Sequence, residues 1–570
     1  MKINKIFIGG VAMLALASCS DYLDVEPATD KANTEFVFSS EGEVNTALNG
    51  VYAKICSDET FGNRLYNEFQ LNSDVDFYAN SNESAAGNQP RRFDMRSDAS
   101  NVEKLWNNLY SGVETANEFI YNLQNSSLYE ENTTTEGTTD ADGRIVQNTV
   151  PEVTDLTQMM GEAKVMRAML YHELLAYWGD IPFTLQATYE TDNLVPPMTN
   201  RQTVSDALID DLKHAAEYMK SEQNLANAPE RISKEAAYAM IARLALQAGG
   251  YSLNHDEGNT SDYKMTRPSN YREYYQTARD YTKRIIDAGG HSLSKSFRQV
   301  FIDECNFIAT TGDDPIFEIP FAKATNSCWG YYQGPANLRR DYICGMWYYS
   351  NQGLPTLRFD YAHHNNKWSK LWNTNGLGAS TTSSTGINFA YIRYADVLLM
   401  FAEADNELNN GPTFDAKEAV KTVRRRAFDA ADQAEKVDAY VDAATSKADF
   451  LKVVLDERKF EFAGENMRWK DLVRNNMYSE KILMTFLTYF AIAEDQAGSS
   501  SYLDMVEEYE GIEYSQLCAT DIFYTYVKNY NDPNFPNTAV YMPYIVNPYG
   551  FVTKPTQKPE AYFTENGLPY

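Results

Sequence analysis

The chain has 570 residues and a formal net charge of −29, with 79 acidic against 50 basic side chains. This acidity argues against nucleic acid as a partner, because its phosphates need a basic surface. A chain of this length can bury a large core, as one big domain or two interlocked ones. Its 40 tyrosines suit wet binding surfaces as well as cores, because each has an apolar ring and a polar tip.

The N-terminus has the features of a secretory signal. Two lysines precede an apolar run at residues 6–17, which is too short to span a bilayer. The run ends in Leu-Ala-Ser-Cys, which resembles a bacterial lipobox and implies cleavage before Cys19 and acylation of that cysteine. Each buried methylene of an acyl chain adds about 0.8 kcal/mol of membrane affinity. A plain secretory signal with an incidental cysteine is the alternative. The acidic residues that follow at 20–24 resemble a surface-export signal of Bacteroidetes lipoproteins.

Helical patterns dominate after a polar tether that ends near residue 34. Ser40 with Glu43, and Ser100 with Glu103, form capping boxes ahead of apolar stripes with helical spacing. Further helices are expected at about residues 157–178, 202–220, 233–248 and 270–288. Pairs of helices joined by loops suggest a helical repeat, although no clean tetratricopeptide sequence period is present.

Two polar stretches interrupt these helices, at residues 67–100 and 125–154. Long irregular excursions inside compact domains are usually functional or disordered. The second stretch contains Asp140-Ala-Asp-Gly143, a fragment of a calcium loop that lacks the downstream glutamate. A structural calcium ion is therefore possible but not indicated.

Helical periodicity is lost from residue 293 to 388, where Gly, Asn, Trp and Tyr dominate and short β-like runs such as 316–321 occur. Helices are expected again at about residues 390–408, 414–430 and 446–462. The tail from residue 499 is rich in Tyr, Asn and Pro and predicts irregular structure.

Charged and aromatic residues alternate densely at residues 456–474. We expect Glu457, Glu461, Arg468 and Asp471 to form ion pairs inside a core, because the planar donors of arginine suit buried carboxylates. A solvated charged face is the alternative, but aromatic neighbours such as Trp469 are too apolar for it.

The same segment resembles the C-terminal signature of the SusD/RagB family, with Glu-Arg, Glu-Phe, Gly-Glu, Arg-Trp and Asp-Leu in that order. Residues 391–404 and residues 161–182 resemble two further stretches of the family, in the right order along the chain. The resemblance implies a mainly α fold, with a tetratricopeptide-like scaffold of helix pairs, a loop-rich second part and few short strands. The expected division is a signal peptide (1–18), a lipidated tether (19–34), a helical region with inserted loops (35–290) and a loop-rich C-terminal region (291–570) with closing helices at 390–476.

Cysteine usage gives no sign of redox or zinc chemistry, since no Cys-x-x-Cys occurs. The cysteines besides Cys19 are Cys56, Cys305, Cys328, Cys344 and Cys518, an odd number. Cys328 and Cys344 could bridge a loop, but buried thiols are favoured.

Catalytic motifs are absent from the sequence. It contains no nucleophile elbow, no phosphate-binding glycine loop and no His-Glu-x-x-His. His363 and His364 are adjacent, and such neighbours rarely ligate one metal together. We therefore predict no catalytic residue, no metal and no cofactor, although carboxylate pairs for glycoside hydrolysis stay open.

Glycan binding needs exposed aromatic platforms flanked by amide, carboxylate or guanidinium groups. Residues 72–92 and 326–348 have this composition. In the SusD/RagB family the glycan contacts come from these two regions. The resemblance implies binding roles for Trp329, Tyr331, Tyr332, Asp74, Asp76, Tyr78, Asn82, Asn88 and Arg91. Trp329 is the best single candidate, whereas Asp74 has the alternative role of capping local backbone.

The function that the resemblance implies is non-catalytic binding of oligosaccharide or polysaccharide at the outer membrane, facing the cell exterior, with delivery to a TonB-dependent SusC-like transporter. A RagB-like peptide ligand is the alternative, and it would need a cleft with exposed backbone donors and acceptors. A surface glycoside hydrolase, with carboxylates about 5–10 Å apart in a cleft, is a third reading.

Overall fold

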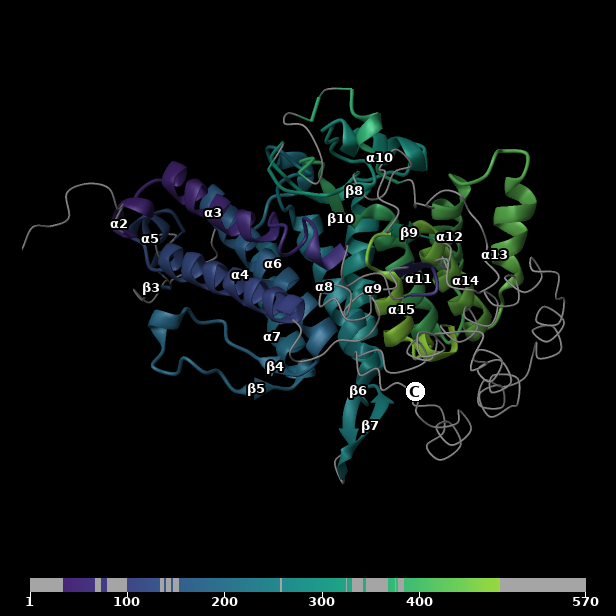
Figure 1. The fold of residues 1–570 in the computed structure, drawn as a ribbon, viewed down its shortest axis with the longest axis horizontal. Coiled ribbons are helices and arrows are strands. Elements are labelled where there is room, and N and C mark those ends of the chain that lie inside the picture. Colours follow the sequence, from purple (N-terminus) through teal and green to yellow (C-terminus); the bar gives the residue numbers. More distant parts are fainter. Residues whose placement is uncertain are drawn as a thin grey trace, which may run out of the picture.

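The computed structural model describes residues 34–66, 73–78, 100–133, 138–139, 145–146, 153–256, 259–323, 325–330, 342–344, 367–374, 376–377 and 384–481. This part of the chain is mainly helical, with short two-stranded sheets (Figure 1), which confirms the predicted fold class. The helices are α2 (Thr34–Val37), α3 (Glu41–Ile55), α4 (Ser100–Gln124), α5 (Ser127–Thr133), α6 (Asp155–Trp178), α7 (Arg201–Glu217), α8 (Lys234–Gly249), α9 (Tyr271–Ala288), α10 (Phe297–Cys305), α11 (Tyr394–Asn409), α12 (Phe414–Arg425), α13 (Tyr440–Ala443), α14 (Lys447–Glu461) and α15 (Arg468–Arg474).

The strands are short and pair two by two in antiparallel fashion. They are β1 (Asp76–Tyr78) with β9 (Tyr342–Cys344), β2 (Thr138–Thr139) with β3 (Ile145–Val146), β4 (Ile181–Pro182) with β5 (Met198–Thr199), β6 (Ser252–Asp256) with β7 (Asn259–Thr266), and β8 (Pro315–Ile319) with β10 (Phe389–Arg393). The β6–β7 hairpin projects from the body of the molecule (Figure 1).

The long helices pack on one another largely in chain order. Helix α6 packs on α3, α4 and α7, and α8 and α9 follow, with α11, α12 and α14 beyond them (Figure 1). Side-chain caps begin several of these helices, as Ser40 does for α3, Ser233 for α8 and Ser446 for α14. Each cap oxygen accepts a backbone N–H that the helix itself leaves without a partner. The predicted cap at Ser40 is confirmed, although among the described residues Ser40 N–H donates no return bond to Glu43, and Ser100, predicted as a second cap, is itself the first residue of α4.

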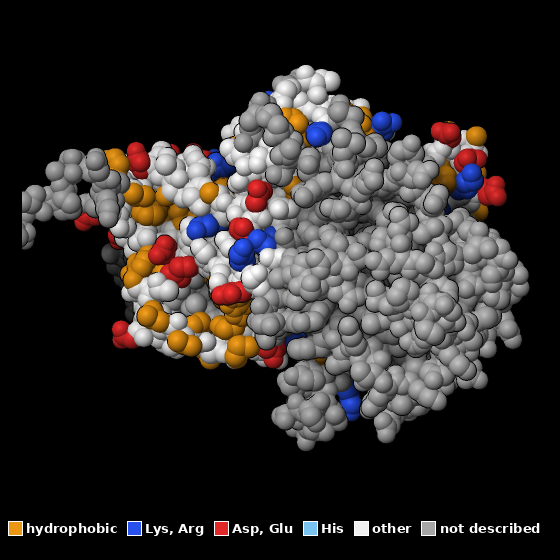
Figure 2. Space-filling view, in the orientation of Figure 1, with side chains coloured by type: hydrophobic (Ala, Val, Ile, Leu, Met, Phe, Trp, Pro, Cys, Tyr) orange, Lys and Arg blue, Asp and Glu red, His pale blue; other side chains and the backbone are white. Residues whose placement is uncertain are grey.

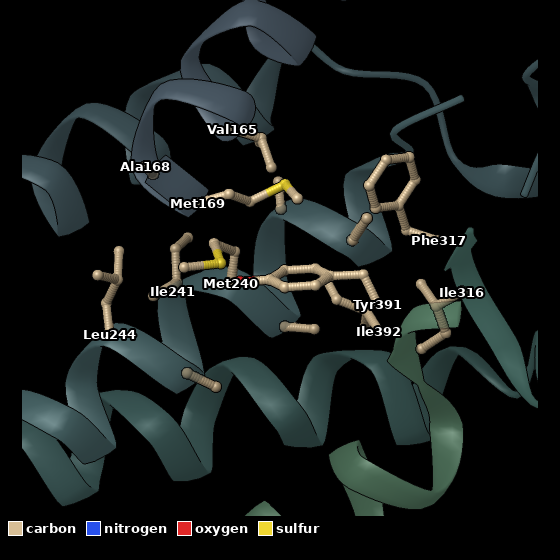
Figure 3. Close-up of a cluster of buried hydrophobic side chains, with 14 of the residues drawn as sticks. Val165, Ala168, Met169, Met240, Ile241, Leu244, Ile316, Phe317, Tyr391 and Ile392 are labelled. Carbon is tan, nitrogen blue, oxygen red and sulfur yellow. The ribbon is translucent and has the colours of Figure 1, made fainter. Parts of the chain in front are cut away.

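One hydrophobic core runs through both halves of the chain. Figure 3 shows Met169 of α6 and Met240 of α8 close to Tyr391 of β10 and Phe317 of β8. Helices α6 and α8 are buried on nearly all sides, which fits the weak amphipathicity of their sequences. The core thus fixes the β8–β10 pair, from which α11 begins directly.

Two predicted loops contain helices. Residues 127–133 form α5 inside the polar stretch 125–154, and residues 297–305 form α10 where helical periodicity was expected to be lost. Helix α10 is short, and Ser296 caps it while Phe301 and Cys305 are buried. Its helical state comes from packing on the core, because so short a segment has little helical stability of its own.

Within the described residues, no helix is both long enough and apolar enough to cross a membrane.

Candidate functional site

The charged segment at residues 456–474 forms α14, α15 and the corner between them. Its four predicted ion-pair residues are all buried. Glu457 pairs with Arg424 at 2.7 Å and Asp471 with Arg458 at 2.7 Å. The prediction of internal ion pairs is confirmed, but most partners come from outside the segment.

Arg393, at the start of α11, is the centre of the largest cluster. Its guanidinium contacts Asp314 at 2.7 Å, Glu461 at 2.5 Å and Glu465 at 2.7 Å. Burial alone would raise the pKa of Asp314, but the guanidinium groups of Arg426 and Arg393 hold that pKa well below its usual range. The cluster ties β8, α11 and α14 into one rigid corner.

The first predicted binding segment is attached to this corner through Asp74. Arg468 donates Nε and Nη2 to the two carboxylate oxygens of Asp74, each at 2.7 Å. Only 6% of the Asp74 side chain and 4% of the Arg468 side chain are exposed. The Asp74 carboxylate therefore serves the scaffold in this structure, and the ligand contact predicted for it stays a prediction.

The two predicted binding segments meet in the β1–β9 ladder. Asp76 pairs with Cys344, Phe77 with Ile343 and Tyr78 with Tyr342. The pairing is antiparallel, so the Tyr78 end of β1 lies beside the Tyr342 end of β9. The structure thereby brings together two stretches that the sequence could only identify one by one. Of the side chains of Asp76 and Tyr78 the structure describes nothing.

Trp329 lies in the core and is not an exposed platform. None of its side-chain surface is exposed, and its ring stacks on Phe389 with 4.3 Å between centroids and 4° between planes. The rings of Tyr66 and Trp368 approach it at 4.7 and 4.6 Å. The expected exposure was wrong because rings from distant parts of the chain cover Trp329, and its binding role stays a prediction.

Trp329 and the rings around it lie, in sequence, beside the ends of the stretches that hold the predicted contacts. Tyr66 immediately precedes the first polar stretch, and Trp329 and Trp368 flank residues 331–366. Trp368 donates Nε1 to Glu304 at 2.6 Å, which fixes its ring. We call Tyr66, Trp329, Trp368 and Phe389 the basal aromatic cluster. Sequence reasoning read Trp329 as a ligand contact, although its place beside a loop end is equally typical of an anchor.

Five predicted contacts, Tyr331, Tyr332, Asn82, Asn88 and Arg91, lie outside the described residues. So do the predicted lipidation site Cys19 and the calcium-loop fragment at 140–143.

Two carboxyl groups near the basal aromatic cluster are buried. Burial raises the pKa of Glu318 to about 8, and Glu304 also has a raised pKa because of burial and the proximity of Glu318. With at most 2% of either residue exposed, neither can reach a substrate in this conformation. In the part of the chain that the structure describes, no group of three His, Cys, Asp or Glu side chains could hold a metal ion.

Cys56, Cys305 and Cys328 are buried or half-buried thiols. The Sγ atom of Cys328 donates to the carbonyl of Gly62 at 3.1 Å, and burial raises the pKa of Cys305 to about 12. The Cys305 thiol is therefore protonated, and both cysteines are buried structural thiols, as expected.

Comparison with known proteins gives a consistent result. The model of the SusD family matches residues 313–547, and a SusD-like model described as "starch-binding associating with outer membrane" matches residues 21–246. SusD-like protein P2 of Formosa agariphila is 25% identical over 500 residues, covering 84% of this chain and 92% of that protein. A SusD-like protein of Bacteroides ovatus is 22% identical over 605 residues, covering 94% and 98%.

Solved structures share the fold. A SusD homolog from Bacteroides thetaiotaomicron has a TM-score of 0.60 at 20% identity and covers 82% of this chain and 92% of its own. Surface glycan-binding protein A from Bacteroides uniformis has a TM-score of 0.52 at 17% identity, covering 76% and 88%.

Proposed function

The chain belongs to the SusD-like family, and from this we propose that it is a non-catalytic lipoprotein of the outer-membrane surface that binds oligosaccharide or polysaccharide and passes it to a TonB-dependent SusC-like transporter. Association with the outer membrane and a binding role agree with the matched family descriptions. The ligand class, the lipid anchor, the outward orientation and the transporter are the proposal.

The β1–β9 ladder is the observation that supports this proposal most directly. It joins two segments rich in aromatic and amide side chains, residues 72–92 and 326–348. Aromatic faces stack on the apolar faces of sugar rings, and amides bind the hydroxyl groups. A site assembled from both segments would supply both kinds of contact.

The base of this candidate site consists of buried side chains that contact one another. The Asp74–Arg468 pair holds the first segment to α15, and the basal aromatic cluster lies at the ends of both segments. A site that is already ordered loses less conformational entropy when its ligand binds. The buried anchors therefore favour a preformed binding surface.

A catalytic role finds little support in the acidic residues of the described chain. Glu457, Glu461, Glu465 and Asp471 of the charged segment are buried and paired with arginines. Hydrolysis of a glycoside needs two carboxyl groups that flank a substrate in a cleft. Buried, paired acids are typical of a structural role.

An exposed hydrophobic segment suits the proposed contact with the transporter. Figure 2 shows hydrophobic side chains gathered over the segment that joins β4 to β5. Leu194, Val195 and Met198 are 67%, 80% and 66% exposed there. Contiguous exposed apolar surface is typical of protein interfaces, and in this proposal the transporter covers it.

Calorimetric titration of the lipid-free protein against a panel of oligosaccharides and peptides tests the proposal. We expect a sugar to bind, and binding to weaken when Tyr331 and Tyr332 are both changed to Ala. The control is Phe460→Ala, which removes an aromatic ring that is 58% exposed on α14 and should leave binding unchanged.

Each other outcome corrects a different part of the proposal. Peptide binding without any sugar response would replace the ligand class, and sugar binding that survives in the double variant would move the site. Release of shortened products from a bound glycan would show that the protein is an enzyme.

A further inference from the structure

A pocket opens between α6, α7, α8 and α15, at the start of β6. The empty space between its walls is about 800 Å³, a figure that includes open solvent at its mouth. Leu175, Ala176, Met467 and Trp469 supply apolar wall. No residue of the basal aromatic cluster lines it.

Two arginines in the wall keep donors that the protein does not use. Asp396 lies between them and accepts from Arg243 Nε at 2.8 Å and from Arg458 Nη1 at 2.7 Å. Arg243 Nη2 donates to the carbonyl of Tyr391, and Arg458 Nε donates to Asp471. Within the described residues, Arg243 Nη1 and Arg458 Nη2 make no hydrogen bond, and neither nitrogen is shut off from solvent.

These donors belong to side chains that are almost wholly buried. Only 8% of the Arg243 side chain and 2% of the Arg458 side chain are exposed. Both residues line the pocket, so their remaining N–H groups are reached through it. Each guanidinium already has two acceptors in the protein, and an acceptor in the pocket would add a hydrogen bond to the remaining nitrogen of each.

Cationic side chains line the pocket, whereas most of their carboxylate partners lie behind its wall. Arg201, Lys470 and Arg474 also line it, whereas Asp471 is the one acidic residue among the described residues of its wall. The other carboxylates that balance these cations, such as Asp396, lie behind the wall. Each of these cations is paired with a carboxylate, but the lining itself has more basic than acidic side chains, which favours an anion over a cation.

A polar acceptor lies in the same wall. Gln247 Oε1 is buried without a hydrogen-bond partner, while the Nε2 group of this side chain donates to the carbonyl of His172 at 3.5 Å. Almost no surface of this oxygen is open to solvent, so a ligand hydroxyl or amide N–H would reach it only when the Gln247 side chain turns into the pocket.

We propose that this pocket binds a small organic anion: a molecule with a carboxylate or sulfate group, a hydroxyl donor and an apolar ring face. The anionic oxygens accept from Arg243 and Arg458, in the charge-assisted geometry that guanidinium groups favour. The hydroxyl donates to Gln247, and the apolar face packs against Ala176 and Trp469. Acidic monosaccharides have all three features. The proposal goes beyond the glycan-import role and does not depend on it.

The test is calorimetric titration of the lipid-free protein with glucuronate, with glucose 6-sulfate and with neutral glucose. We expect at least one of the anions to bind about tenfold or more tightly than glucose, a difference of about 1.4 kcal/mol. Glucuronate and glucose 6-sulfate distinguish a carboxylate ligand from a sulfate ligand. Failure of both anions to bind, or equal binding of glucose, would overturn the proposal.

Two variants locate the site without touching the arginines that hold the core. Ala176→Leu adds bulk where the helix surface faces the pocket, and Arg201→Gln removes a cation from its rim. We expect each to weaken anion binding by about tenfold.

The matched control is Arg272→Gln on α9. Both Arg201 and Arg272 donate to backbone carbonyls, and Arg272 does not line the pocket. Thermal unfolding of each variant shows whether it is folded. Anion binding that persists in folded Ala176→Leu protein would place the ligand elsewhere and overturn the assignment. Because Tyr331 and Tyr332 are unchanged in these variants, oligosaccharide binding at the β1–β9 site is measured independently.

Discussion

Arg468 and Asp74 form a two-pronged ion pair, with both N···O distances at 2.7 Å, between residues that are 394 positions apart in the chain. Arg468 also donates Nη1 to the carbonyl of Leu455 at 2.8 Å. The arginine of the C-terminal signature thus holds the start of the first predicted binding segment against α14 and α15. This pair connects the part of the sequence that identifies the scaffold with the part that is expected to meet the ligand.

Asp74→Asn should destabilise the protein by about 3–5 kcal/mol, because it leaves the buried Arg468 charge without its counter-ion. Urea unfolding measures the loss. Asp432→Asn is the control, since the Asp432–Lys436 pair is about half exposed and such pairs contribute about 0–1 kcal/mol. We also expect weaker sugar binding in Asp74→Asn, as its segment loses an anchor. Equal effects of the two substitutions on stability would contradict the anchoring role.

Trp329→Ala should also act mainly on stability. Removing a fully buried aromatic side chain costs about 3–5 kcal/mol, and the ring contacts with Phe389, Tyr66 and Trp368 would all be lost. Trp329→Phe keeps a ring against Phe389 and should cost less. Thermal unfolding of the native protein, Trp329→Ala and Trp329→Phe gives their order of stability. A Trp329→Ala protein with unchanged stability and lost sugar binding would instead restore the role of Trp329 as a binding platform.

Much of the scaffold was predictable from the sequence. Helices such as α9 were predictable within a residue or two because their apolar positions recur with helical spacing, and the buried pairing of Glu457 and Asp471 followed from aromatic neighbours. The partners were not predictable, since Arg424 and Asp74 lie far from the segment in sequence. Helix α10 was missed because packing on the core, more than periodicity, makes it helical.

The candidate site was predictable only in its composition. Residues rich in Tyr, Trp and Asn marked the two segments, but the pairing of Tyr78 with Tyr342 has no local signal. The burial of Trp329 was equally unpredictable from the sequence. Trp329 is flanked by Cys328 and Gly330 and reads as a loop residue, yet Phe389, from a strand far along the chain, stacks on it.

The Glu318 carboxyl should make stability depend on pH. Burial raises its pKa from 4.5 to about 8, so between these values the folded protein holds a proton that the unfolded chain releases. The contribution to the free energy of unfolding is fully present below about pH 4.5 and is lost as pH rises through about 8. The slope is at most about 1.4 kcal/mol per pH unit.

Glu318→Gln isolates this contribution, because the amide oxygen can still accept from Asn388 Nδ2, which lies 3.2 Å from the carboxylate. We expect the stability of the variant relative to the native protein to increase from about pH 5 to about pH 8, measured by urea unfolding at each pH. A difference that does not change with pH would show that Glu318 releases its proton in the folded state near its ordinary pKa.

The exposed segment between β4 and β5 should matter for assembly and not for folding. Changing both Leu194 and Val195 to Ser removes surface that is 67% and 80% exposed, so the free energy of unfolding should change by less than about 0.5 kcal/mol. Capture of the transporter from solubilised native membranes should fall. Phe414→Ser, at a residue of α12 that is 78% exposed, is the control. Equal capture by all three proteins would place the transporter contact on another surface.

Cys19 should decide where the mature protein is found. If its acyl chains anchor the protein, the full chain will sediment with outer membranes, and Cys19→Ala will not, because no other lipid then holds it there. Cell fractionation measures the distribution, and the mass of the mature N-terminal peptide shows whether the lipid is present. Cys56→Ala is the control, since Cys56 is a half-buried thiol in the core and should leave the anchor intact. Native protein recovered entirely in the soluble fraction, with an unmodified N-terminus, would support the plain secretory signal instead.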